Sequence, residues 1–192
     1  MASPTAPTPR ATEMTTTIDE PIRRQGRLPH ELAMVNLLVF NLMLCGGLLA
    51  GTMARKGSWL EQHRAWLVAL PLAASLAVMA YSRRRARHAA ATSPAFVAAH
   101  WRSTVGRYRF LLGAYGVSAA LIGLGWLAAY SNPSLHDILF VALVRVAVAP
   151  LLISVMVIAV LESSALFQAN LGEAPAIKAP IAPPREDAAP PA

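Results

Sequence analysis

The amino-acid sequence predicts an all-α membrane protein in which four transmembrane helices form a bundle with both termini on the cytoplasmic side. Three observations predict this fold: four long apolar segments, almost no charge inside them, and an unequal distribution of Arg and Lys among the connections. Composition agrees, because 55% of the residues are hydrophobic and 14% are charged, whereas about 25% charged residues is ordinary for a soluble domain. The excess apolar surface is expected to face lipid.

The four apolar segments cover residues 32–54, 65–82, 110–130 and 138–161. About 20 apolar residues in a helix rising roughly 1.5 Å per residue cross a hydrocarbon core about 30 Å thick. The first three segments contain no charged residue and no histidine, and the fourth contains a single charge. The first segment begins too late and is too long for the core of a cleavable signal peptide, so it is expected to be retained as a helix.

The positions of Arg and Lys predict the orientation of the chain. Four precede the first segment, seven lie between the second and third, and two follow the fourth, which places thirteen on one side. Residues 55–64 contain three, and residues 131–137 contain none. By the positive-inside rule, both termini and the middle connection are expected in the cytoplasm. The tails, residues 1–28 and 172–192, are rich in Pro and Ala and are expected to be disordered, leaving 29–171 as the membrane domain.

The connection between the second and third segments is predicted to lie against the membrane surface. A basic collar follows the second segment directly and would attract anionic lipid headgroups; it consists of Arg83, Arg84, Arg85 and Arg87. Ser93 and Pro94 then form a typical helix start, and an apolar stripe that includes Trp101 predicts an interfacial amphipathic helix over 94–109. A docking surface for a cytosolic partner is the alternative interpretation of this stripe.

The fourth segment is predicted to continue past the membrane. Residues 162–171 are compatible with a helix, and Asn170 and Gly172 provide a C-terminal stop. Pro150 lies within the segment and is expected to kink the helix, because its ring excludes a backbone hydrogen bond.

Small and polar residues inside the segments predict how the helices pack. Gly47 and Gly51 form a GxxxG motif in the first segment, and the third carries a face of small residues that includes Gly116, Ala120 and Gly123. Such faces let two backbones approach closely, so the first and third segments are the predicted central pair. A polar layer is expected at one depth of the bundle, formed by Asn41, Ser75 and Ser118.

Arg145 is the one charge within an apolar segment, and a functional role is the default hypothesis for such a residue. It lies about 11 Å inside the predicted outer end of its helix, where burial of Arg costs roughly 2.5–3.5 kcal/mol. Either the long side chain reaches outward to water, or an acidic group pairs with it. Asp137 lies two turns above on the same helical face, and a partner subunit could also supply the acid.

Sites for chemistry are not evident from the sequence. All five histidines lie in connections or at segment ends, which does not favour haem held between helices, and Cys45 has no partner cysteine. No cofactor, metal or enzymatic activity is therefore expected. The net charge of +7 gathers beside the apolar segments, so nucleic-acid binding is not expected either.

These features favour a non-catalytic membrane protein, an accessory, assembly or structural subunit of a larger membrane complex. Its expected partners are the lipid bilayer with its anionic headgroups and other membrane-protein subunits. The alternative is a small oligomeric channel or transporter with an anion-favouring path near Arg145. Arg outnumbers Lys fifteen to two, which suggests a GC-rich bacterium and hence its cytoplasmic (inner) membrane.

Overall fold

The computed structural model describes residues 18–131 and 136–175, which are helical except for short connections. The elements are α1 (Glu20–Val35), the π-helix η1 (Asn36–Asn41), α2 (Leu42–Met53), α3 (Trp59–Thr92), α4 (Ala95–Ser131) and α5 (His136–Leu171). Because α1, η1 and α2 follow one another without a break, the described residues form four helical rods. Each rod is long and apolar enough to span a membrane, as expected of an integral membrane protein.

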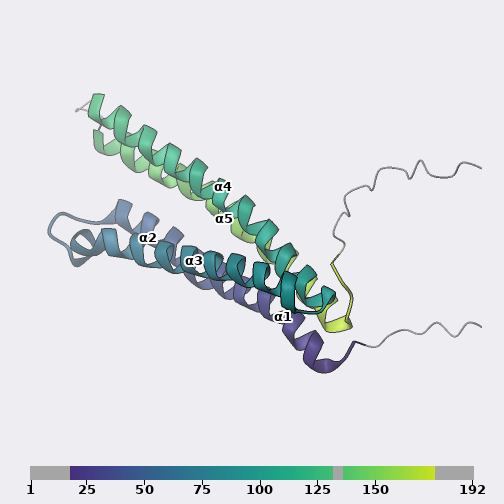
Figure 1. Cartoon of the computed structure of the whole chain (residues 1–192). Helices are drawn as coiled ribbons and strands as arrows, with labels where there is room; N and C mark the ends of the chain where they lie inside the picture. The colour runs from purple at the N-terminus through teal and green to yellow at the C-terminus, as the bar shows by residue number, and fades with distance from the viewer. Residues whose placement is uncertain (1–17, 132–135, 176–192) are drawn as a thin grey trace, which may run out of the picture.

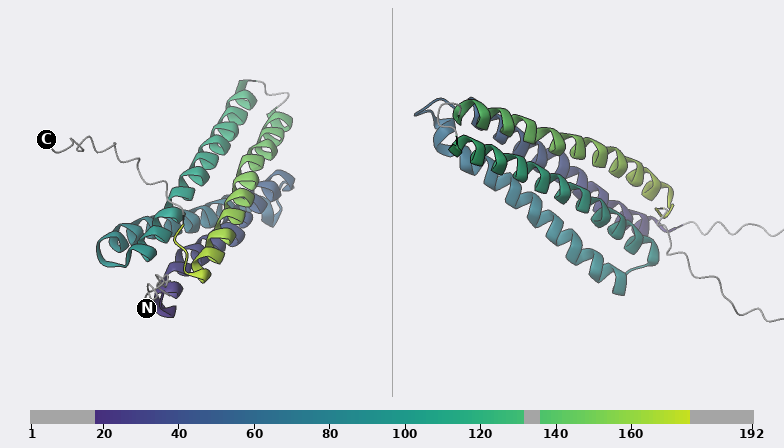
Figure 2. Two further views of the ribbon diagram at one scale, coloured as in Figure 1. Left: turned by 90° about the vertical axis from the view of Figure 1, so that its right-hand side faces the viewer. Right: turned by 90° about the horizontal axis from the view of Figure 1, so that it is seen from above.

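The four rods are arranged as two hairpins that diverge (Figure 1). The first hairpin consists of α1, η1, α2 and α3, and the second consists of α4 and α5. We call the end where α1 begins and α5 finishes the terminal end, and the opposite end the loop end. The hairpins lie together at the terminal end and separate toward the loop end, and a second view also shows α4 beside α5 and away from α2 (Figure 2).

The hydrophobic core is thickest where both hairpins meet. Ala33 of α1, Leu37 of η1 and Leu111 of α4 have no exposed surface, and Ile158 of α5 is 1% exposed. A second cluster continues toward the loop end through Cys45 and Leu151. The lone cysteine is therefore a buried packing residue.

Residues 94–109 do not form the separate interfacial helix that we predicted. They are the first part of α4, which continues from Ala95 to Ser131. Val97 and Trp101 are buried against Ala89 of α3 and against partly buried side chains of α1. An apolar stripe has the same spacing whether lipid or protein covers it, and here another part of the chain covers it.

The helices also extend further than the apolar segments. α1 begins at Glu20, although residues up to 28 were expected in the disordered tail; Glu20 forms ion pairs with Arg23 (2.9 Å) and Arg27 (3.1 Å), which support its first turns. α5 continues through Pro150 and ends at Leu171, and Gly172 follows with φ of 78°, the left-handed conformation that commonly ends a helix. The remaining parts of the predicted tails, 1–17 and 176–192, lie outside the described residues.

Candidate functional site

Five polar side chains meet inside the terminal end, and we call them the terminal cluster: His30, His100, Thr104, Arg107 and Glu162. His30 comes from α1, Glu162 from α5 and the other three from α4. His30, His100, Thr104 and Glu162 have no exposed surface. The cluster therefore joins three of the four rods where the two hairpins lie together.

Local sequence explains how α4 contributes three members of the terminal cluster. His100, Thr104 and Arg107 are spaced by four and three residues, so they lie along one face of the helix. Glu162 follows the last residue of the fourth apolar segment, and α5 packs beside α4 along its length. The antiparallel pairing of these helices brings Glu162 opposite that face.

Hydrogen bonds in the terminal cluster run from the carboxylate of Glu162 through two imidazole rings to the backbone. The Nδ1 atom of His30 contacts Oε2 of Glu162. Its Nε2 atom lies 2.8 Å from Nδ1 of His100, and Nε2 of His100 lies 3.2 Å from the carbonyl oxygen of Glu173. A carbonyl oxygen only accepts, so His100 donates from Nε2 and a neutral His100 accepts at Nδ1. Nε2 of His30 therefore donates to Nδ1 of His100.

Two further groups surround the carboxylate. Nη1 of Arg107 lies 3.1 Å from Oε2 of Glu162, and the hydroxyl of Thr104 lies 3.4 Å from the same oxygen. Oε1 of Glu162 has no hydrogen-bond partner among the described residues. A fully buried carboxylate is costly unless neighbouring groups compensate for its lost hydration, and the contacts with His30, Thr104 and the Arg107 guanidinium do so here.

The surroundings of His100 alter its proton affinity. His100 precedes the apolar segment 110–130 by ten residues. Burial, followed by the nearby charge of His30, lowers the pKa of His100 from 6.5 to about 4. The neutral state that the hydrogen bonds require of His100 is therefore also the state that its surroundings favour.

The sequence reasoning did not predict the terminal cluster. All histidines were expected in connections or at segment ends, and Glu162 was expected only as part of the helical extension 162–171. The available signal was the spacing of His100, Thr104 and Arg107 on one face of a helix, since three polar residues in line require a polar neighbour when that face is buried. Among the described residues, no group of three His, Cys, Asp or Glu is placed to hold a metal ion.

The predicted polar layer is divided between two places. Nδ2 of Asn41 donates to Oγ of Ser75 (3.1 Å) and to the carbonyl oxygen of Asn36 (2.9 Å), and the Tyr115 hydroxyl donates to Oδ1 of Asn41 (2.6 Å). Ser118 instead donates to the carbonyl oxygen of Ala147 (2.6 Å). The bond from Asn41 to Asn36 spans the π-helix η1, which the sequence analysis did not predict.

Only one of the predicted packing glycines lies at a close approach of two helices. A Cβ at Gly47 would lie 2.5 Å from the backbone oxygen of Leu67 on α3, whereas Gly51, Gly116 and Gly123 have nothing within 4 Å. Among the described residues α2 and α4 are not neighbours, so the glycines of the first segment do not pack on the small-residue face of the third. The first and third segments meet instead through Ala33, Leu37 and Leu111, nearer the terminal end. The GxxxG motif did not identify the partner, because small residues allow close packing without selecting the helix that packs.

The close approach within the second hairpin uses a different glycine. A Cβ at Gly125 of α4 would lie 3.0 Å from Cβ of Leu143 on α5. Ala120, which we predicted to belong to the small-residue face, is exposed.

Arg145 lies exposed on α5 in the part of the helix nearer the loop end. Its Nε donates to the hydroxyl of Thr52 on α2 across 3.4 Å. The guanidinium borders an open groove of about 390 Å³ that is also lined by Ile138, Val141 and Ala142. The side chain of Asp137, its predicted partner, lies outside the described residues.

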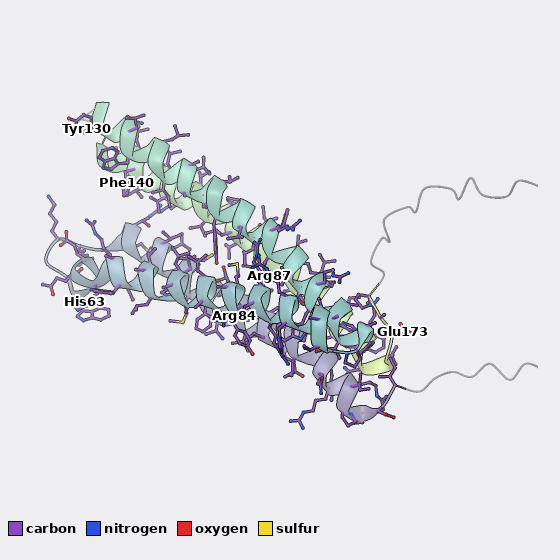
Figure 3. The ribbon with its side chains drawn as sticks, viewed as in Figure 1. His63, Arg84, Arg87, Tyr130, Phe140 and Glu173 are labelled. Carbon is purple, nitrogen blue, oxygen red and sulfur yellow. The ribbon has the colours of Figure 1, made fainter. Side chains whose placement is uncertain are left out.

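The basic collar is helical and belongs to α3. Arg83, Arg84 and Arg87 are exposed and Arg85 is half-buried; Arg84 and Arg87 are labelled in Figure 3. Trp101, which we grouped with the collar as a surface anchor, is 4% exposed and packs edge to face with Tyr81 of α3 at a centroid distance of 6.4 Å. The collar thus lies on the α3 side of the junction with α4.

No protein-family model, curated protein or solved structure matches this chain. Function must therefore follow from the chemistry of its own surfaces. The terminal cluster is enclosed and ties helices together, whereas Arg145 and the collar are accessible.

Proposed function

We propose that this protein is a non-catalytic integral membrane subunit, an accessory or assembly component of a larger membrane complex in the bacterial cytoplasmic membrane. The observation that carries the proposal is Arg145. It is a charge within an apolar, membrane-length helix, it is exposed, and among the described residues it makes a single hydrogen bond, to Thr52. A partner subunit would provide the acidic group that the described residues do not place beside Arg145.

The energetic argument concerns the unused donors of Arg145. A guanidinium has five N–H donors, and the bond to Thr52 uses one of them at a length of 3.4 Å. Holding Arg inside a bilayer costs roughly 2.5–3.5 kcal/mol unless water or polar groups solvate it. A carboxylate or backbone carbonyl on a neighbouring helix would satisfy the remaining donors, and the apolar groove beside Arg145 would receive side chains of that helix.

The divergence of the hairpins supports a role in assembly. Toward the loop end, α4 exposes Leu124 and Trp126, and α5 exposes Val146. Figure 3 shows Tyr130 and Phe140 near each other at the far end of the second hairpin, away from His63 at the end of the first. Each hairpin therefore offers apolar surface to a neighbour as well as to lipid.

We place both termini in the cytoplasm. The start of α1 and the end of α5 are neighbours, since Nη1 of Arg27 donates to Oδ1 of Asn170 across 2.9 Å. The basic collar and the arginines of α1 belong to the same terminal end. Positive charges gather on the cytoplasmic side of bacterial membrane proteins, which favours this orientation.

Site-specific photo-crosslinking in intact membranes tests the proposal. A crosslinking residue at position 142, beside Arg145, is expected to give one discrete adduct with another membrane protein, and the adduct is expected to disappear in Arg145→Ala. The control position is Ala77, exposed on α3, where no Arg145-dependent adduct is expected. Adducts with lipid alone at both positions would contradict the proposal.

A channel or transporter is the competing function, and purified protein in liposomes distinguishes it. The subunit proposal predicts no anion flux above that of empty liposomes. Chloride flux that is lost in Arg145→Ala and retained in Arg64→Ala, a loop-side control, would replace the subunit proposal with the channel.

A further inference from the structure

We propose that the groove between α3 and α4 at the terminal end binds one anionic phospholipid, with its phosphate among four arginines and an acyl chain along the apolar part of the groove. The groove has a volume of about 460 Å³, within the roughly 300–1,000 Å³ typical of ligand sites. The four arginines are Arg83, Arg87, Arg102 and Arg109.

Helical spacing builds each wall of this lipid groove. On α3 the wall runs from Leu76 through Ala80 to Arg83 and Arg87, at intervals of three and four residues. On α4 it runs in the opposite direction along the bundle, from Leu112 to Arg109 and Arg102. The two antiparallel walls therefore change from apolar to basic in the same direction.

This change in polarity matches the depth profile of a lipid. Leu76, Ala80 and Leu112 belong to the apolar segments 65–82 and 110–130, whereas the four arginines lie outside them. The boundary between hydrocarbon and headgroups thus crosses the groove. A soluble phosphate would fill only the basic part, but a phospholipid fills both parts.

The charges in the lipid groove lack a partner within the described chain. No acidic side chain lines the groove, and none of its four arginines forms an ion pair or hydrogen bond among the described residues. Arg107, on the neighbouring face of α4, behaves differently because it pairs with Glu162. Guanidinium groups bind phosphate with paired N–H donors, so an anionic headgroup is the complementary occupant.

The test is native mass spectrometry of the full-length protein in detergent with added phosphatidylglycerol or phosphatidylcholine. We expect one tightly bound phosphatidylglycerol, and about tenfold weaker binding in the double variant Arg83→Gln/Arg87→Gln. The matched control is Arg84→Gln/Arg85→Gln, which removes the same charge from the same collar outside the groove. Binding by the control is expected within twofold of wild type.

Two tryptophan substitutions, one inside and one outside the groove, test whether an acyl chain occupies its apolar part. Ala80→Trp fills the apolar part without changing charge and is expected to weaken lipid binding, whereas Ala77→Trp, exposed on α3 outside the groove, is not. Inorganic phosphate at millimolar concentration is expected not to displace the lipid.

Three results would overturn the proposal. Equal weakening by both arginine pairs would show that the collar attracts lipid through its total charge only. Unaltered binding in Ala80→Trp would show that no chain enters the groove, and full displacement by inorganic phosphate would show an anion site. If the double arginine variant does not fold, Arg102→Gln against Arg85→Gln answers the same question on α4.

Discussion

The two ends of this molecule use polar residues in opposite ways. At the terminal end, His30 bonds to residues 70 and 132 positions away in the sequence. At the loop end, the ring of His63 bonds to the carbonyl oxygen of Trp59, four positions away. A network of long-range polar contacts holds the two hairpins together at the terminal end. Toward the loop end, the described residues join the hairpins through the 3.4 Å hydrogen bond from Arg145 to Thr52. The same residue type therefore contributes to tertiary structure or to local structure according to what lies opposite it.

The difference predicts where the bundle opens. Regions with few buried contacts unfold locally at lower free energy than regions with many. The loop end can therefore separate while the terminal end stays closed, which is compatible with the proposed binding of another subunit.

Removing the carboxylate of Glu162 should have the largest effect, because it destabilises the terminal end relative to the loop end. Glu162→Ala leaves the Arg107 guanidinium without its counterion and the buried His30 ring without its carboxylate partner, and breaking a buried pair this way costs about 3–5 kcal/mol. Thermal unfolding in detergent, followed by circular dichroism, should show this loss. Glu31→Ala, an exposed carboxylate beside His30, should change little, and equal effects of the two variants would exclude a structural role for the terminal cluster.

Low pH should have the second-largest effect, because it lowers the stability of the terminal end. The folded pKa of His100 is about 4, below the ordinary 6.5, so the unfolded chain binds more protons between these values and stability falls as the pH is lowered from 6.5 toward 4. The loss reaches at most about 3 kcal/mol. The unfolding temperatures of wild type and His100→Asn are compared at pH 7 and at pH 4.5. Glu162, His30 and Arg107 are intact in both proteins. The wild type should lose more of its unfolding temperature at pH 4.5 than the variant does. Parallel pH profiles would show that His100 is not the titrating group.

Adding a methyl group where α2 and α3 approach closely should lower the free energy of unfolding by less than the two preceding changes. Gly47→Ala places Cβ 2.5 Å from the Leu67 backbone oxygen, and forcing two packed helices apart typically costs about 1–3 kcal/mol. Gly51→Ala, the other half of the predicted motif, has nothing within 4 Å and should be neutral. The free energies of unfolding of the two variants are measured in the same detergent. Destabilisation by Gly51→Ala would indicate that both glycines of the GxxxG motif lie at a helix contact.

Loss of the Asn41 side chain should cost about 1–2 kcal/mol, because interhelical hydrogen bonds in membranes average about 0.6 kcal/mol each. A double-mutant cycle of Asn41→Ala with Tyr115→Phe should show coupling, since the two side chains share a hydrogen bond. The cycle of Asn41→Ala with Ser118→Ala should be additive. Coupling in the second cycle would mean that the predicted single polar layer exists.

Arg145→Ala should have the smallest effect on stability, within about 0.5 kcal/mol, because the side chain is exposed. Unfolding in detergent would measure it. A loss comparable to that of Glu162→Ala would mean that Arg145 serves the fold of the single chain, and would weaken its proposed role toward a partner.

Features with a local cause were predictable, and features with a distant partner were not. Apolar length alone identified the four rods, because a helix in lipid must satisfy its own backbone. The stripe at Val97 and Trp101 was recognised, but sequence spacing could not show that α1 and α3 cover it. The pairing of His30 with Glu162 depends on which helices become neighbours, and nothing in either segment specifies the other.

The terminal cluster also imposes an order on biosynthesis. His30 leaves the ribosome 132 residues before Glu162, which at about 5–20 residues per second is roughly 7–26 s. Throughout that interval the nascent chain carries His30, and later Arg107, without the carboxylate that both contact in the folded protein. A truncated product never acquires it, so completion of the last helix is what locks the bundle, and prematurely ended chains are left open to proteolysis.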